Sequence, residues 1–151
     1  KGCAIMKSVY SSLEDGSKFH PVNGSGLQDS NKDDLIHENK VTARLETALL
    51  EKILANKEKY AKYKLLLPTP GGAGTLSARF KMGRKLAKIY AKTGTLGATK
   101  SLAGYAETSK GVIVFSVIGD RLKGMGVKEA MAGPIESIVY AHVKYLKDKG
   151  L

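Results

Sequence analysis

Three successive strand-like segments near the middle of the chain constrain its fold more than any other feature. Residues 88–96, 101–108 and 112–118 have the length and residue types of strands, and turn-forming residues separate them. The connections, around residues 97–99 and 109–111, are short enough for hairpins, so neighbouring strands should run antiparallel. We therefore predict an antiparallel sheet at the centre of the domain.

A helix is predicted ahead of this sheet. Thr42 is a suitable N-cap, and apolar residues recur at helical spacing from Leu45 to Ile53. The helix can continue through residues 57–64, because opposite charges stand four residues apart there. The prolines that follow must end it.

Two more helices are predicted near the ends of the chain. Residues 4–13 carry apolar side chains four apart, which predicts a short helix with one buried stripe formed by Ile5, Val9 and Leu13. A longer helix begins at Pro134, and its apolar face is formed by Ile135, Ile138, Val139, Val143 and Leu146. The predicted fold class is therefore α+β, with an antiparallel sheet flanked by helices.

The charge balance of the chain is strongly basic. It has 25 lysines and arginines against 14 acidic residues, a net charge of +11, which would attract a polyanion such as nucleic acid or an anionic cell envelope. Tyr60, Tyr63, Tyr90 and Tyr105 stand among these lysines and could stack on bases. We expect them to pack within the protein instead, and we keep a basic binding module as an alternative.

Several other classes of protein have little support in the sequence. The single cysteine, Cys3, excludes an internal disulfide and a zinc site with paired cysteines. His20, His37 and His142 are far apart, so no metal site is predicted, and His142 is expected to pack on the last helix. No run of about eighteen apolar residues occurs, so no transmembrane segment is expected.

The residues with the clearest chemical meaning are Lys92, Thr93 and Gly94, on the first predicted strand. An edge strand offers backbone N–H and C=O groups to an extended peptide. Lysine adds a positive charge for a carboxylate and for proton transfer, and threonine adds a hydroxyl. Glycine leaves the strand bare, so that a substrate can approach it closely. The triplet predicts one wall of a peptide-binding active site.

A phosphate-binding loop is a competing interpretation of the same region. Residues 94–101 nearly match the pattern G-x-x-x-x-G-K-S, but Thr99 replaces the second glycine. A loop of that kind must also open a helix, whereas a strand is predicted from Ser101. Nucleotide binding is therefore not favoured.

Three blocks of the sequence resemble the D-alanyl-D-alanine carboxypeptidase/endopeptidase family, the low-molecular-mass class C (peptidase S13-like) penicillin-binding proteins. The first is KTGTLGATKSLAGY at 92–105, followed by the strand VIVFSVI. The second is NGSGL at 23–27, which resembles the family's D-G-S-G-L turn. The third, LPTPGGAGTLSARF at 67–80, resembles L-P-x-x-G-x-x-G-T-L-x-x-R-F. Their order and spacing match over roughly residues 22–120.

This resemblance implies a penicillin-binding, serine β-lactamase-like transpeptidase fold and a serine hydrolase without a cofactor. Such an enzyme forms an acyl-enzyme with D-Ala-D-Ala or cross-linked peptide stems of peptidoglycan, is acylated by β-lactams, and works in the bacterial periplasm or another extracytoplasmic location. Lys92 and Thr95 would be catalytic, with the Thr95 N–H as an oxyanion donor. Thr93, Gly94 and Thr95 would bind substrate, the two hydroxyls meeting its terminal carboxylate.

The chain also departs from the family pattern. No serine has a lysine three residues later, and the second motif, S-x-N, is missing too. In the family both precede the block at 23–27, so residues 1–151 are expected to be the C-terminal segment of the penicillin-binding domain. The N-terminal segment of the same protein would supply the nucleophile. Residues 28–38 resemble a surface insertion, and a catalytically inactive scaffold remains a further alternative.

Overall fold

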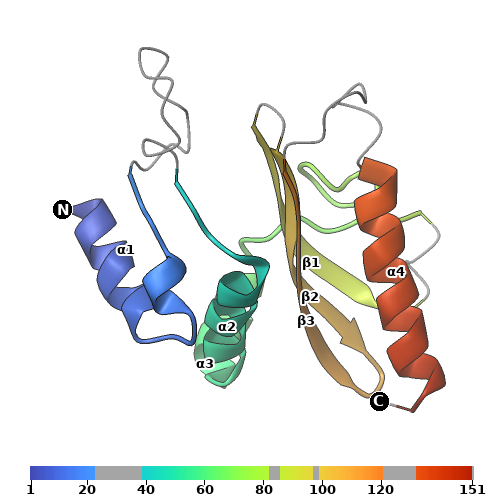
Figure 1. Cartoon of the computed structure of the whole chain (residues 1–151). Helices are drawn as coiled ribbons and strands as arrows, with labels where there is room; N and C mark the ends of the chain where they lie inside the picture. Colours follow the sequence, from blue (N-terminus) through green and yellow to red (C-terminus); the bar gives the residue numbers. More distant parts are fainter. Residues whose placement is uncertain (23–38, 82–85, 97–98, 121–131, 151) are drawn as a thin grey trace.

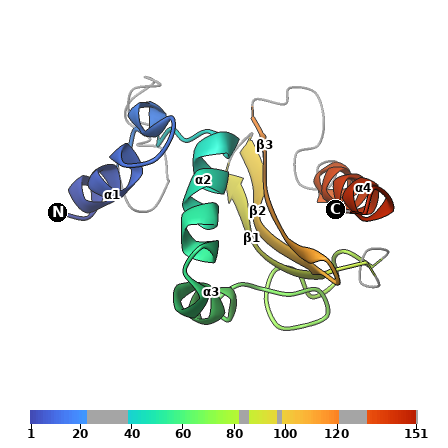
Figure 2. The ribbon, with the colours of Figure 1, turned by 90° about the horizontal axis from the view of Figure 1, so that it is seen from below.

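The computed structural model describes residues 1–22, 39–81, 86–96, 99–120 and 132–150. A three-stranded sheet lies between two layers of helix: α4 (Ala132–Asp148) covers one face, while α2 (Ala43–Leu54) and α3 (Lys57–Lys64) lie on the other (Figure 1 and Figure 2). The predicted α+β class and the flanked antiparallel sheet are confirmed.

The sheet consists of β1 (Lys88–Leu96), β2 (Thr99–Thr108) and β3 (Gly111–Gly119), antiparallel and in the order β1-β2-β3. The first strand has the predicted bounds. The second and third are slightly longer than predicted, because interstrand pairing continues beyond the apolar residues, as far as Leu96 opposite Thr99.

Side chains alternate between the two faces of the sheet, as the strand geometry requires. Ile89 and Ala91 of β1 are buried in one cluster with Val139 and Val143 of α4. On the opposite face, the buried Tyr105 of β2 lies beneath the other helices. Its hydroxyl donates to the Leu50 carbonyl of α2 at 3.0 Å, and the Tyr60 ring of α3 meets it edge to face, with centroids 4.8 Å apart. Each face therefore has its own packed core.

The helix predicted to continue from α2 through residues 57–64 is in fact two helices. Thr42 caps α2 as predicted, since its hydroxyl accepts from the Leu45 N–H at 3.2 Å. Asn56 then begins α3, because its side-chain oxygen accepts from the Lys59 N–H at 2.9 Å. The predicted charge pair does form within α3, between Glu58 and Lys62 at 2.6 Å. The Asn56 cap therefore divides into two helices the segment that charge spacing had predicted to be one.

Two further details of the helix predictions are wrong. The N-terminal helix forms as α1 (Gly2–Ser11) but has no buried residue, and Ile5 is 66% exposed. Near its end, Tyr10 stacks on Phe19, with ring centroids 4.0 Å apart. In α4, Ile138 is 56% exposed and His142 is also exposed. The sheet covers a narrower stripe of α4 than the apolar pattern suggested.

The block at 23–27 and the expected insertion at 28–38 lie outside the described residues. Among the helices that the structure does describe, none combines the length and the apolar character needed to cross a membrane.

Candidate active-site strand

The strand that carries Lys92, Thr93 and Gly94 lies at an edge of the described sheet. The N–H of Ala91 points away from β2 and donates to the Pro68 carbonyl at 3.1 Å. Because backbone groups in an antiparallel pair alternate sides along the strand, the N–H and C=O groups of Thr93 and Thr95 point toward the same outer edge. The edge therefore presents Thr95 with its N–H directed outward, as an oxyanion donor requires.

Lys92 lies on the face of the sheet that α2 covers. It lines a groove of about 190 Å³ together with Thr93, Gly94, Ser101 and Ala103 of the sheet and Tyr10, Glu46, Leu49, Leu50 and Tyr63 of the helices. The Lys92 ammonium is exposed and donates to the Thr93 carbonyl at 2.6 Å. The structure thus brings three of the four predicted site residues to one groove, while the fourth, Thr95, is exposed further along the same edge.

Glu46 supplies a carboxylate to the same groove. A residue of the sheet holds this carboxylate in place, because the Ser116 hydroxyl donates to its Oε2 at 2.7 Å. Burial raises the pKa of Tyr10 and of Tyr63, and the charge of Glu46 raises both further. Both phenols therefore stay protonated at neutral pH. The groove combines a cationic lysine with a carboxylate and neutral hydroxyl donors.

Gly94 has a steric role in this arrangement. A Cβ atom at this position would lie 2.4 Å from Oγ of Ser101 on the neighbouring strand. A side chain at residue 94 would therefore require the Ser101 side chain to move, and it would lie on the face of the strand that lines the groove.

Thr75 also contacts the site, although it is not one of the predicted site residues. Its hydroxyl lies 3.0 Å from the Thr93 hydroxyl and forms a hydrogen bond with it. The two residues are eighteen positions apart, so spacing within the strand could not have paired them. The available signal was the G-T-L step of the LPTPGGAGTLSARF block, whose threonine is Thr75.

Comparison with known families settles the class of protein. The sequence profile of the D-Ala-D-Ala carboxypeptidase 3 (S13) family matches residues 17–138. The chain belongs to this family. No curated protein and no solved structure gave a significant match. S13 membership confirms the resemblance found in the sequence and indicates D-Ala-D-Ala carboxypeptidase activity, that is, a serine peptidase-type hydrolase acting on peptidoglycan.

The described structure bears directly on the competing interpretations. Ser101 lies within β2, paired opposite Gly94, so no helix begins where a phosphate-binding loop would need one. Tyr60 and Tyr63 pack edge to face on Tyr105, as expected for tyrosines used in packing. In the part of the chain that the structure describes, no group of three or more histidine, cysteine or acidic residues could hold a metal ion.

Proposed function

We propose that this S13 chain is the substrate-aligning part of a serine D,D-peptidase that cleaves D-Ala-D-Ala termini or cross-links of peptidoglycan through an acyl-enzyme. The observation that carries the proposal is the geometry of β1, an edge strand whose lysine lies in a groove and whose Thr93 and Thr95 backbone groups point outward. The proposal includes a penicillin-binding, β-lactamase-like transpeptidase fold, completed by an N-terminal segment of the same protein.

The proposed mechanism assigns each residue of β1 a separate task. A peptide stem lies extended along the outer edge beyond Ala91, where the backbone groups of Thr93 and Thr95 can pair with it. The Thr95 N–H donates to the carbonyl oxygen as negative charge develops there, and the Thr93 and Thr95 hydroxyls donate to the terminal carboxylate. Lys92 stabilises negative charge and holds the serine of the second motif. The nucleophile and its base come from the N-terminal segment.

Two further parts of the proposal follow from the same chemistry. A β-lactam presents a strained amide beside a carboxylate, so it should acylate the same nucleophile as the peptide substrate. Because the proposed substrate is a component of the cell wall, the proposal includes a working location in the periplasm or another extracytoplasmic compartment of a bacterium. No cofactor is required for an acyl transfer of this kind.

The test is labelling of the full-length protein, including its N-terminal segment, with fluorescent penicillin. We expect the unsubstituted protein to be labelled and Lys92→Ala to be labelled roughly a hundredfold more slowly or worse. Lys88→Ala is the matched control, because Lys88 is also exposed and lies on the same face of β1, four residues away. The proposal is refuted if the unsubstituted protein is not labelled, which would favour an inactive scaffold, or if the two variants behave alike.

A further inference from the structure

The loop of residues 68–80, here called the bracing loop, runs beside the outer edge of β1 and continues toward α4 (Figure 2). At its start, the Pro68 carbonyl accepts from Ala91, one residue before Lys92. Further on, the Thr75 hydroxyl meets that of Thr93 at 3.0 Å, and the next residue, Leu76, is fully buried in the core shared with α4. The loop thus links the candidate active-site strand to the core.

The conformation of the bracing loop is set by its own backbone. Gly71 and Gly74 have φ values of 80° and 96°, a region that favours glycine. The Gly71 N–H donates to the Ser77 carbonyl at 3.1 Å, and the Ser77 N–H donates to the Gly74 carbonyl at 3.2 Å. These bonds close the loop around Thr75, so the position of its hydroxyl does not depend on a flexible connection.

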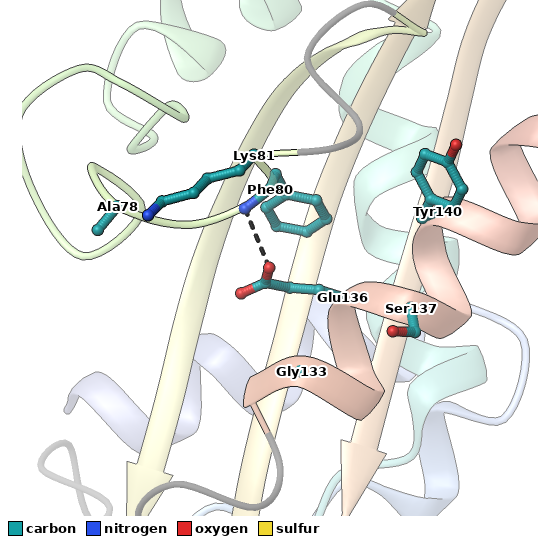
Figure 3. Close-up of a pocket in the computed structure, with 7 residues that line it drawn as sticks. All are labelled: Ala78, Phe80, Lys81, Gly133, Glu136, Ser137 and Tyr140. Atoms are coloured by element: carbon teal, nitrogen blue, oxygen red, sulfur yellow. Dashed lines mark hydrogen bonds between the residues drawn. The ribbon is translucent and has the colours of Figure 1, made fainter.

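The far end of the loop is anchored by Glu136 of α4. One carboxylate oxygen accepts from the Phe80 N–H at 3.0 Å (Figure 3), and the other forms an ion pair with Arg79. Phe80 has a φ of 54°, which is unusual for a residue with a side chain. Such conformations persist where the surroundings hold them in place, and here the buried phenyl ring and Glu136 do so. Thr75 is therefore fixed on both sides.

The paired hydroxyls matter because each can donate only one hydrogen. In the structure Thr93 donates to Thr75. A carboxylate can only accept, so a substrate carboxylate at the edge needs the Thr93 hydrogen for itself. If Thr75 donates to Thr93 instead, the Thr93 hydrogen is released toward the ligand and its oxygen keeps a partner.

We propose that Thr75 is a positioning residue for the carboxylate-binding step: it donates to Thr93 and thereby directs the Thr93 hydroxyl toward the anionic end of the substrate. This inference rests on the proposed function. Thr75 acts through Thr93, so its effect should be limited to ligands that carry the carboxylate.

The experiment measures the acylation rate constant of the full-length protein with benzylpenicillin and with its methyl ester, which lacks the carboxylate. We expect Thr75→Val to slow acylation by benzylpenicillin about fivefold, equivalent to one hydrogen bond of about 1 kcal/mol, and to leave the rate with the ester unchanged. Thr75→Ser, which retains the hydroxyl, should restore most of the rate. In a Thr93→Val background, Thr75→Val should cause no further loss.

The outcomes separate this inference from the proposed function. If the unsubstituted protein is not acylated at all, the proposed function fails and the inference fails with it. If the unsubstituted protein is acylated but Thr75→Val matches it, only the inference is overturned. If Thr75→Val slows acylation by benzylpenicillin and by its methyl ester equally, the inference is also overturned, because the substitution then acts on the structure of the site and not on carboxylate binding. Because Thr75 is exposed, the Thr75→Val variant should unfold at the same temperature as the unsubstituted protein.

Discussion

Gly104 of β2 lies directly behind the candidate active-site strand, and its replacement by alanine should be severely destabilising. A Cβ atom added there would lie 2.1 Å from the Tyr90 carbonyl oxygen and 2.6 Å from the Cα of Ala91. Both neighbours are backbone atoms, and both distances are well inside the 3.4 Å at which ordinary contact begins. The clash cannot be relieved by a side-chain rotation, so β1 and β2 must separate locally.

We expect Gly104→Ala to lower the free energy of unfolding by about 3 kcal/mol, the upper end of the usual cost of overpacking, because the strand hydrogen bonds beside it also weaken. For a protein of this size, that loss corresponds to a fall in melting temperature of roughly 6–12 °C. Guanidinium denaturation and thermal unfolding, both followed by circular dichroism, would measure it. Penicillin labelling should fall as well, since the displaced Ala91 precedes Lys92.

Gly133→Ala is the matched control, because it makes the same chemical change in the first turn of α4, where an added Cβ meets nothing within 4 Å. Alanine has the higher helix propensity, so this variant should be as stable as the original or more stable by up to about 1 kcal/mol. The packing argument would be refuted if Gly104→Ala and Gly133→Ala unfolded at the same denaturant concentration.

Three other substitutions test the packing around the sheet. Tyr105→Phe removes the buried hydroxyl that donates to the Leu50 carbonyl, and it should lower the free energy of unfolding by about 1 kcal/mol in denaturant titrations. An unchanged free energy of unfolding would show that this hydrogen bond does not stabilise the fold. Burial works to raise the pKa of Glu107, but hydrogen bonds, first of all that from Lys64, outweigh it and hold this pKa below its usual value. The ionised Glu107 carboxylate therefore stabilises the folded state above the usual pKa of about 4.3, and this stabilisation is lost as pH falls through the folded-state pKa. Glu107→Gln should be less stable than the unsubstituted protein at pH 7, and the two proteins should become equally stable in acid. Glu136→Ala should cost about 2 kcal/mol in thermal unfolding, because its carboxylate binds two donors of the bracing loop, and a loss under about 0.5 kcal/mol would contradict that role.

Much of the local structure was predictable from residue patterns. The bounds of β1 were predicted because the strand is delimited by turn residues and has the composition of a strand, both of which are local properties. The cap at Thr42 was predictable for the same reason. The break at Asn56 was missed because the charge pair that suggested continuity is equally stable in a separate helix.

Exposure was predicted less well than secondary structure. An apolar pattern shows which side chains could be buried, but burial also depends on the partner that covers them. Ile138 and Ile5 follow the helical pattern of their neighbours and are nevertheless exposed, because the described sheet and helices do not reach them.

The sequence by itself determined the family, the class of fold and the identity of the candidate site residues Lys92, Thr93, Gly94 and Thr95, because motifs and strand patterns are written in consecutive residues. Only the tertiary structure decided that β1 lies at an edge, that the Thr95 amide points outward, and that Thr75 meets Thr93. Hydrogen bonds between strands and loops join residues far apart in the chain. The spacing of neighbouring residues therefore does not predict these hydrogen bonds.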